Sequence, residues 1–244
     1  MIVVYTGTPG SSKTLHAVAD IRYALTKPSR TAQPVIANFP IDTTQRLKHM
    51  DAFHFMRNDL ITPKMLTDFA EDFWASSGVP FQEDYILLVL DECQLIFNAR
   101  SWQSKGSGKG DSRLDWLEFL SQHRKYGYKV ILIAQSSKMI DNQFRMLVEI
   151  EVNHRACTSM GLFGAVMQFL PVKAFFWVKL LYQTREPLGM RPYVLQRRHA
   201  RLYDANLTNP RPFASAHLCH RAAHVSSVAH MAASPKARVS GKAA

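Results

Sequence analysis

A short run of glycine, serine, lysine and threonine near the N-terminus has the residue types and spacing of a phosphate-binding loop. It reads GTPGSSKT and comprises Gly7, Thr8, Pro9, Gly10, Ser11, Ser12, Lys13 and Thr14. In such a loop the glycines let the backbone bend, so that successive N–H groups converge on a phosphate at a helix N-terminus. Lys13 would place a positive charge beside the oxygens of the β- and γ-phosphates, and the Thr14 hydroxyl would ligate Mg²⁺. The alternative is an ordinary Gly/Ser turn that leads into a helix.

One position departs from the usual pattern of these loops. Glycine ordinarily precedes the lysine, and this chain has Ser12 there. If the position requires a positive φ, a residue other than glycine costs about 1–2 kcal/mol. The substitution therefore predicts weaker nucleotide binding than a glycine would give.

Two carboxylates follow the apolar run Ile86–Leu90 and form a second candidate group. Asp91 and Glu92 come directly after it, and the carboxyl edge of an open α/β sheet is where such folds bind ligands. We expect Asp91 to hold Mg²⁺, directly or through water, opposite Thr14, and Glu92 to polarise an attacking water. Because strands often end in a solvated acid, this prediction depends on the loop that lies 77 positions upstream of Asp91.

Three further polar residues are candidates for the same chemistry. Gln135 follows the apolar run Val130–Ala134, at the position where additional-strand ATPases hold a sensor of the γ-phosphate. Arg100 and Arg145 flank predicted loops from which a guanidinium would reach a neighbouring subunit's phosphate as an arginine finger. For Gln135 the alternative is a polar residue that simply leaves a strand.

The elements that must position these residues follow from apolar periodicity. Helices are predicted at 14–25, 61–74, 114–126 and 141–147, strands at 2–5, 34–39, 85–90 and 130–134, and further strands or hairpins within 148–183. Residues 101–113 are rich in Gly, Ser and Lys and predict a loop. Apolar runs without alternation are typical of strands covered on both faces of a parallel sheet. The expected fold is α/β, with a mostly parallel central sheet flanked by helices.

The formal net charge of +11 over 244 residues would favour an anionic partner, but its distribution weakens that inference. Residues 196–244 hold eight Lys or Arg against one acid, which leaves a net charge of +4 for residues 1–195. The same C-terminal segment is a mixture of Ala, Ser, His and Arg without periodicity, and we expect residues 208–244 to be disordered. The three cysteines are far apart, which argues for a reducing compartment and against a zinc knuckle.

Neither a signal peptide nor a transmembrane helix is expected from this sequence. The N-terminus has no basic region before its apolar residues. The longest uncharged stretch, 156–172, contains polar residues and two glycines, and it falls short of the roughly 20 mostly apolar residues that a spanning helix needs.

The ordered string of motifs resembles the zonular occludens toxin (Zot) family, whose members are P-loop ATPases of filamentous-phage assembly and extrusion. The positions that match the family pattern after the loop are Asp91, Glu92, Gln94, Ala99, Arg100, His123, Arg124, Gly127, Gln135, Asp141 and Arg145. The departures are Ser12 for glycine, Cys93 for alanine and Ala134 where threonine often stands. The resemblance covers about residues 1–207, which it identifies as a Zot-like P-loop NTPase domain of the additional-strand type.

The resemblance implies an ATP- and Mg²⁺-dependent motor at the cytoplasmic face of the bacterial inner membrane. It implies a homo-multimer that meets phage coat and assembly proteins and, indirectly, single-stranded phage DNA. Family members typically continue through a membrane span, and we expect that anchor to be absent from this chain.

Three other functions stay open from the sequence. Ser12 would suit a nucleotide-binding interaction module without turnover. A toxin-like effector is the activity that named the family, although no signal peptide is expected. A small-molecule kinase lacks support, since no lid-like arginine cluster or acceptor-binding motif stands out.

Overall fold

A computed structural model of the chain describes residues 1–28, 32–42, 44–45, 47–97, 112–156, 174–194 and 197–203. All of them belong to one compact unit, Met1–Asn206. The predicted tail, the first eleven residues of the predicted loop 101–113 and Arg100 lie outside the described residues.

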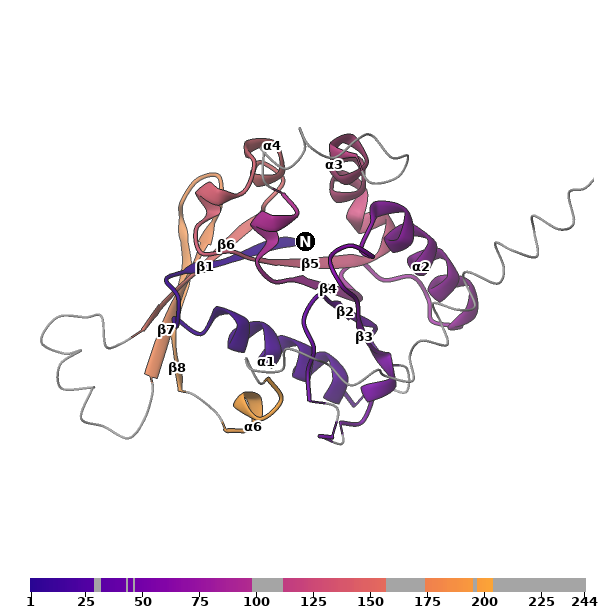
Figure 1. Cartoon of the computed structure of the whole chain (residues 1–244), viewed down its shortest axis with the longest axis horizontal. Coiled ribbons are helices and arrows are strands. Elements are labelled where there is room, and N and C mark those ends of the chain that lie inside the picture. Colours follow the sequence, from indigo (N-terminus) through magenta and orange to yellow (C-terminus); the bar gives the residue numbers. More distant parts are fainter. Residues whose placement is uncertain are drawn as a thin grey trace, which may run out of the picture. The chain divides into compact units, whose positions relative to one another are not determined.

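An eight-stranded sheet forms the centre of the fold, in the order β3-β2-β4-β5-β1-β6-β7-β8 (Figure 1). The strands are β1 (Ile2–Gly7), β2 (Val35–Ala37), β3 (Phe53–Phe55), β4 (Ile86–Leu90), β5 (Tyr128–Ile133), β6 (Ile150–Ala156), β7 (Ala174–Leu181) and β8 (Pro187–Val194). The first six strands in this order are parallel, and β7 and β8 are added antiparallel. Because β5 lies between β1 and β4, the sheet has the additional strand that was expected. The α/β P-loop NTPase fold is thus confirmed.

Helices cover both faces of the sheet. They are α1 (Lys13–Thr26), α2 (Pro63–Ser76), α3 (Arg113–Gln122), α4 (Asn142–Arg145) and α6 (Arg197–Ala200), with short 3₁₀ turns η1 (Met50–Ala52), η2 (Cys93–Leu95), η4 (His123–Tyr126) and η5 (Ser137–Met139). Figure 1 shows α1 and α6 on one side of the sheet and α2, α3 and α4 on the other. Successive side chains of a strand point to opposite faces of the sheet, so an apolar strand can pack against helices on both sides.

The two faces of the sheet bury two separate apolar clusters. Along β1, Ile2 and Val4 contact the layer of α2, α3 and α4, whereas Val3 and Tyr5 contact the α1 layer. Every residue of β4 is buried, as the apolar run without alternation predicted. The strand that delivers the two candidate carboxylates is therefore fixed on both sides.

Local signals in the sequence set several helix ends. The Ser112 hydroxyl accepts from the backbone N–H of Asp115, and the Asp115 carboxylate accepts from the N–H of Ser112, which is a capping box at the start of α3. Gly127 ends η4 with φ 78°, and a Cβ there would lie 2.6 Å from the Trp74 ring. The predicted stop at Gly127 is confirmed, and only glycine fits that position.

The structure corrects some details of the predicted elements. The short strand β3 and the strand β8 were not predicted, and the last four residues of the predicted helix 114–126 form the 3₁₀ turn η4. Leu114, which the helical spacing placed on the apolar face, is 74% exposed. The side chains of α3 that are buried are Trp116, Phe119 and Leu120.

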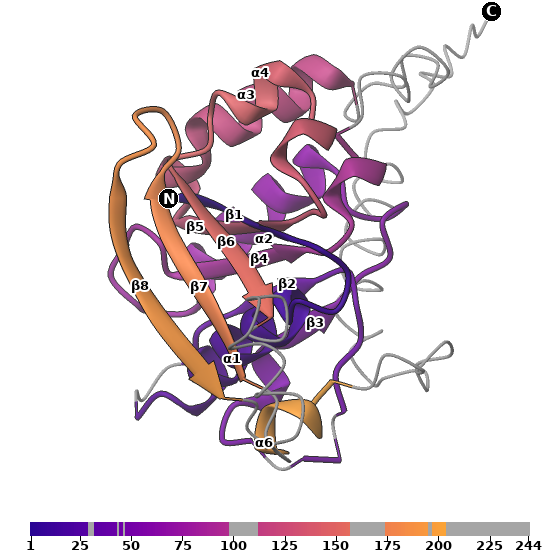
Figure 2. The same cartoon turned by 90° about the vertical axis from the view of Figure 1, so that its left-hand side faces the viewer.

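The strands β7 and β8 form a long antiparallel pair beside β6 (Figure 2). β8 ends the sheet and contains Pro187, Gly189 and Pro192. Within the described ranges, no helix combines the length and the apolar character that crossing a bilayer requires.

Candidate functional site

The predicted phosphate loop lies between the carboxyl end of β1 and the start of α1. The loop turns tightly, since the N–H of Ser11 donates to the Thr8 carbonyl at 3.1 Å. Gly7 has φ 143°, and a Cβ there would lie 2.3 Å from the His154 carbonyl oxygen and 2.6 Å from Ser11 Oγ. Gly7 is therefore required by both its backbone conformation and the packing of β6 against the loop.

Ser12 adopts the left-handed conformation, with φ 71° and ψ 24°. This is the condition under which the sequence predicted a cost of about 1–2 kcal/mol for a residue other than glycine. The Ser12 carbonyl accepts from the N–H of His16 at 2.9 Å, so the residue still closes the first turn of α1. The backbone strain therefore lies at Ser12, next to Lys13.

Lys13 folds over the loop. Its ammonium donates to the carbonyl oxygens of Gly7 at 2.8 Å and of Thr8 at 3.1 Å. Burial lowers the pKa of Lys13, and the nearby carboxylates Asp91 and Glu92 oppose that shift. The Lys13 ammonium thus lies within the loop, beside the place where a phosphate would bind.

Thr14 and Asp91 meet at the head of the site, as the sequence predicted. The Thr14 hydroxyl donates to Asp91 Oδ2 at 2.9 Å, across 77 residues of sequence. Burial raises the pKa of Asp91, while the hydrogen bonds from Thr14 and from the N–H of Glu92 oppose that shift. A hydroxyl and a carboxylate are oxygen ligands suited to Mg²⁺.

Asn38 holds the end of β4 in place and was not predicted. Its side-chain amide donates to the Asp91 carbonyl at 2.7 Å, and its Oδ1 accepts from the Asp91 N–H at 2.6 Å. Asn38 follows β2, the neighbour of β4. The rule that singled out Asp91, a polar residue where a buried strand ends, would have found it.

Glu92 turns out of the strand and is exposed. Its backbone is left-handed, with φ 48°, and its N–H donates to Asp91 Oδ1 at 2.8 Å. The Gln94 amide donates to the Glu92 carboxylate. A left-handed residue other than glycine is costly and is typical of functional sites. The geometry leaves the carboxylate beside Asp91 and open to solvent.

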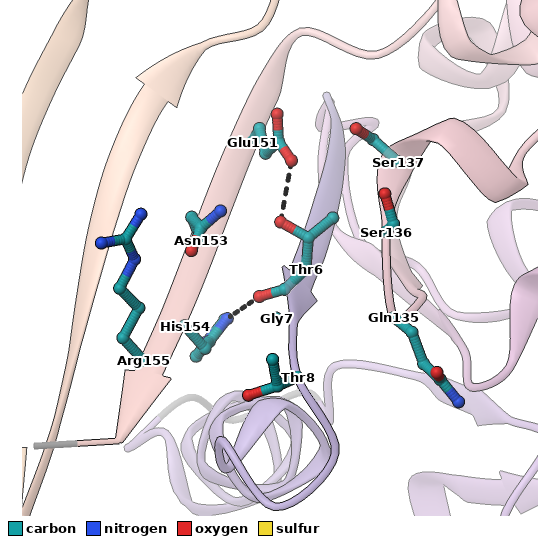
Figure 3. Close-up of a pocket in the computed structure, with 10 residues that line it drawn as sticks. All are labelled: Thr6, Gly7, Thr8, Gln135, Ser136, Ser137, Glu151, Asn153, His154 and Arg155. Carbon is teal, nitrogen blue, oxygen red and sulfur yellow. Dashed lines mark hydrogen bonds between the residues drawn. The ribbon is translucent and has the colours of Figure 1, made fainter. Parts of the chain in front are cut away.

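Gln135 lies next to the loop on the β5 side. Its carbonyl accepts from the N–H of Gly7 at 3.3 Å. Its exposed side chain lines a cavity of about 440 Å³ together with Thr6, Gly7 and Thr8 (Figure 3). Its role as a γ-phosphate sensor stays a prediction.

Of the two candidate arginines, Arg145 lies among the described residues, and no hydrogen bond joins it to the loop there. Arg145, in α4, donates to Asn142 Oδ1 at 2.7 Å and lines a second cavity. Arg100 lies outside the described ranges. Their role as arginine fingers stays a prediction.

Other positions of the motif string have structural partners. Asp141 caps α4 through the N–H of Gln143 at 2.9 Å and accepts from the Arg113 guanidinium at 2.7 and 2.8 Å. His123 lies against the Leu120 carbonyl oxygen, with 2.7 Å between its Nδ1 and that oxygen. These residues stabilise the layer of helices above the sheet.

A pair of histidines on the β6 side of the loop, of which His154 is buried and His16 partly buried, was not predicted. His16 Nδ1 lies 2.8 Å from His154 Nε2, and His154 Nδ1 lies 3.2 Å from the Thr6 carbonyl oxygen. The His16 ring stacks between Tyr5 and Trp177. Burial, reinforced by His16, lowers the pKa of His154 to about 3. No spacing in the sequence pairs two histidines that are 138 positions apart.

The residues present fit a nucleotide with a metal ion. Ser11 Oγ is buried in the loop without a hydrogen-bond partner, and the Gly7 backbone leaves no room for a side chain. Among the described residues, no group of three or more His, Cys, Asp and Glu side chains is placed to hold a metal on its own. A Mg²⁺ ion at Thr14 and Asp91 would complete its coordination with phosphate oxygens and water, which is its usual behaviour.

Comparison with known proteins finds a matching family model and similar phage proteins. The family model described as zonular occludens toxin (Zot) matches residues 1–174. The gene 1 proteins of Salmonella phage IKe and Enterobacteria phage I2-2 are each 30% identical over 147 residues, or 59% of this chain and 37% of the relative. The match thus spans little more than a third of the length of these relatives.

A solved structure supports the fold. The N-terminal domain of zonular occludens toxin from Neisseria meningitidis superposes with a TM-score of 0.50 at 18% identity, covering 83% of this chain and 98% of that domain. At this identity the likeness establishes the fold alone.

Proposed function

Because the chain belongs to the zonular occludens toxin (Zot) family and its loop meets two carboxylates, we propose that it binds and hydrolyses ATP in filamentous-phage assembly and extrusion. The observation that carries the proposal is the contact between the Thr14 hydroxyl and Asp91 Oδ2 at 2.9 Å, beside Lys13. An ordinary Gly/Ser turn and a solvated acid at the end of a strand would not be expected to lie in contact when 77 residues separate them in sequence. A magnesium–phosphate site requires that they do.

Each residue of the site has a task in this proposal. The backbone N–H groups of the loop hold the phosphates, and Lys13 offsets charge on the β and γ oxygens. Bound Mg²⁺ would neutralise charge on the same oxygens. Thr14 and Asp91 would hold that ion, and Glu92 would orient the attacking water and accept its proton. Gln135, one strand along the edge of the sheet, would contact the γ-phosphate.

The cellular setting is part of the proposal. The gene 1 proteins named above belong to phages, which supports a role in phage assembly. We propose that copies of the chain assemble into a homo-multimer at the cytoplasmic face of the inner membrane. There they would act with coat and assembly proteins on the emerging particle.

Phosphate release from ATP tests the hydrolase directly. We expect Mg²⁺-dependent turnover in the wild type and a loss of at least 100-fold in Lys13→Ala, in line with the loss of other preorganised charges. Lys27→Ala is the matched control, because Lys27 ends α1 far from the loop in sequence and contacts the Tyr23 ring. Equal turnover in wild type and Lys13→Ala would overturn the proposal.

A nucleotide-binding module without turnover is the second candidate, and the left-handed Ser12 favours it. It predicts that a fluorescent ATP analogue binds while no phosphate is released, even when multimers form. Ser12→Gly relieves the strain in the loop but adds no catalytic group. Phosphate release that appears in this variant would therefore show that strain had prevented turnover.

A further inference from the structure

Gln94 follows the two candidate carboxylates and, unlike Glu92, is buried. It is 9% exposed and lies in the 3₁₀ turn η2, which begins directly after Glu92. A backbone hydrogen bond closes this turn, since the N–H of Leu95 donates to the Glu92 carbonyl at 2.9 Å. The Gln94 side chain therefore starts from a backbone with little freedom.

The turn η2 is also anchored in the apolar core. Cys93 and Phe97, on either side of Gln94, are fully buried, and the N–H of Phe97 donates to the Cys93 carbonyl at 2.9 Å. The centre of the Phe97 ring lies 5.1 Å from that of Trp116 and 4.8 Å from that of Phe144. The Gln94 amide is thus a fixed group beside an exposed carboxylate.

Within the described ranges, the buried amide of Gln94 has a single hydrogen-bond partner. Its Nε2 donates to the Glu92 carboxylate, whereas its Oε1 is buried without a partner. Turning the amide over would bring Oε1 against a carboxylate oxygen, so Nε2 is the atom that must face Glu92. A buried oxygen without a partner lowers stability. An apolar side chain of similar volume would avoid that loss, and stability therefore does not account for a glutamine here.

Glu92, by contrast, has a side chain with many orientations open to it. It is exposed, and an unrestrained glutamate side chain has much rotamer freedom. The hydrogen bond from its N–H to Asp91 Oδ1 fixes only its backbone. Among the described residues, Gln94 supplies the donor that restrains the carboxylate itself. A hydrogen bond to an ionised acceptor is stronger than one between neutral groups.

We propose that Gln94 is a positioning residue, whose amide holds the Glu92 carboxylate beside Asp91 in the orientation that accepts a proton from the attacking water. The inference rests on the proposed function and extends it to a residue that acts only through Glu92. In that hydrolysis the water oxygen bonds to the γ-phosphorus, the bond from phosphorus to the ADP oxygen breaks, and the water proton passes to Glu92. Gln94 keeps its protons throughout and contributes by orienting the acceptor.

Gln94→Met tests the proposal, because methionine has a similar volume and cannot donate a hydrogen bond. We expect kcat for phosphate release from ATP to fall about 10-fold at unchanged KM, since the orientation of the base changes and nucleotide binding does not. The unfolding temperature should rise by about 2–4 °C, because an apolar group replaces the unpartnered oxygen. A glutamine that only supports the fold would give lower turnover together with a lower unfolding temperature.

Gln82→Met is the matched control. It makes the same substitution at an exposed position before β4. Its kcat should stay within about twofold of the wild type and its unfolding temperature within about 1 °C, as is usual for surface substitutions.

A double-mutant cycle shows whether Gln94 acts through Glu92. Once Glu92→Gln has removed the proton acceptor, adding Gln94→Met should lower phosphate release by less than about twofold, because no base is left to orient. Single-turnover conditions, with the protein in excess over ATP, measure the slow variants. A further loss of about 10-fold in the Glu92→Gln background would mean that Gln94 acts on something else.

Four results for Gln94→Met would overturn the proposal. They are an unchanged or raised kcat, a loss that appears in KM alone, an unfolding temperature that falls together with turnover, and equal losses with and without Glu92→Gln. If the wild type releases no phosphate, the proposed function fails and the positioning role fails with it. Turnover in the wild type that is unchanged in Gln94→Met overturns only the role of Gln94. The two failures are thereby distinguished.

Discussion

The two sides of the phosphate loop are built from different chemistry. On the β4 side, Thr14, Asp91 and Glu92 are polar, partly open to solvent and joined by few hydrogen bonds. On the β6 side, His16 and His154 are joined to each other and packed among aromatic rings. The difference teaches that the loop is anchored on the β6 side and, under the proposed function, reactive on the β4 side. Stability and turnover should therefore respond to different substitutions.

The largest expected effect is on the reactive side. Glu92→Gln should lower ATP turnover by about 10²–10⁴-fold, the usual contribution of a general base, because the amide cannot accept the proton of water. Nucleotide binding and the unfolding temperature should not change, since Glu92 is exposed. Single-turnover phosphate release and thermal unfolding measure the two quantities. Glu71→Gln, an exposed change on α2, is the control.

An unfolding temperature that falls together with turnover in Glu92→Gln would contradict the separation between the two sides. It would mean that the exposed carboxylate also contributes to the anchoring of the loop.

Gly7 lies where the two sides join, and its replacement should cost the most stability. Gly7→Ala adds a Cβ 2.3 Å from the His154 carbonyl oxygen at φ 143°, so the free energy of unfolding should fall by about 3 kcal/mol or more. Gly10→Ala is the matched control, because φ is also positive there but a Cβ meets nothing within 4 Å. We expect about 1–2 kcal/mol for that variant.

Chemical denaturation at pH 7 measures both glycine variants. If Gly10→Ala proved as destabilising as Gly7→Ala, the contact of the loop with β6 would not be the anchor.

The histidine pair predicts a pH dependence on the anchored side. The pKa of His154 is lowered to about 3 in the folded chain, against about 6.5 in the unfolded chain. Below pH 6.5 the unfolded state binds the extra proton, so stability is fully present above that pH and falls as the pH falls toward 3. Between pH 7 and pH 4.5 the free energy of unfolding should decrease by about 2–3 kcal/mol.

His154→Gln tests this assignment, because it removes the titrating group and keeps a polar side chain. Its free energy of unfolding at pH 7 should be about 1–3 kcal/mol lower than that of the wild type, and its slope between pH 7 and 4.5 should be flatter. If the slope is unchanged in His154→Gln, the histidine pair is not the cause of the pH dependence.

The smallest expected effect belongs to Ser12. Ser12→Gly should stabilise the folded chain by at most about 1 kcal/mol, because the relief of the left-handed strain is partly offset by the greater freedom of glycine in the unfolded chain. Tighter binding of an ATP analogue should accompany it. Denaturation and analogue titration measure both, and weaker binding in the variant would show that the serine hydroxyl contributes to the site.

The residues of the reactive side could be predicted from the sequence because each of their patterns is local. A glycine-rich turn after a buried strand and two acids after another buried strand are visible as short runs, and parallel strands bring their carboxyl ends to one edge. The anchored side could not be predicted, because His16 and His154 carry no signal of their pairing. Their contact depends on β6 lying beside β1.

The same distinction between local patterns and long-range pairing explains which strands could be predicted. The strands β1, β4 and β5 were predicted from continuous apolar runs. β8 was missed because its prolines and glycine argue against a strand, and it is formed by pairing with β7. The exposed Leu114 shows that helical spacing gives the period of a helix but not the width of the face that is covered.

The two ends of the described sheet have a consequence for self-association. β3 has only three residues, and β8 carries Pro187 and Pro192, which cannot donate to a neighbouring strand. Short and proline-bearing edges resist the strand-by-strand addition that leads to aggregation. In the proposed homo-multimer, copies of the chain should therefore meet through side-chain surfaces and not by extending one sheet into the next.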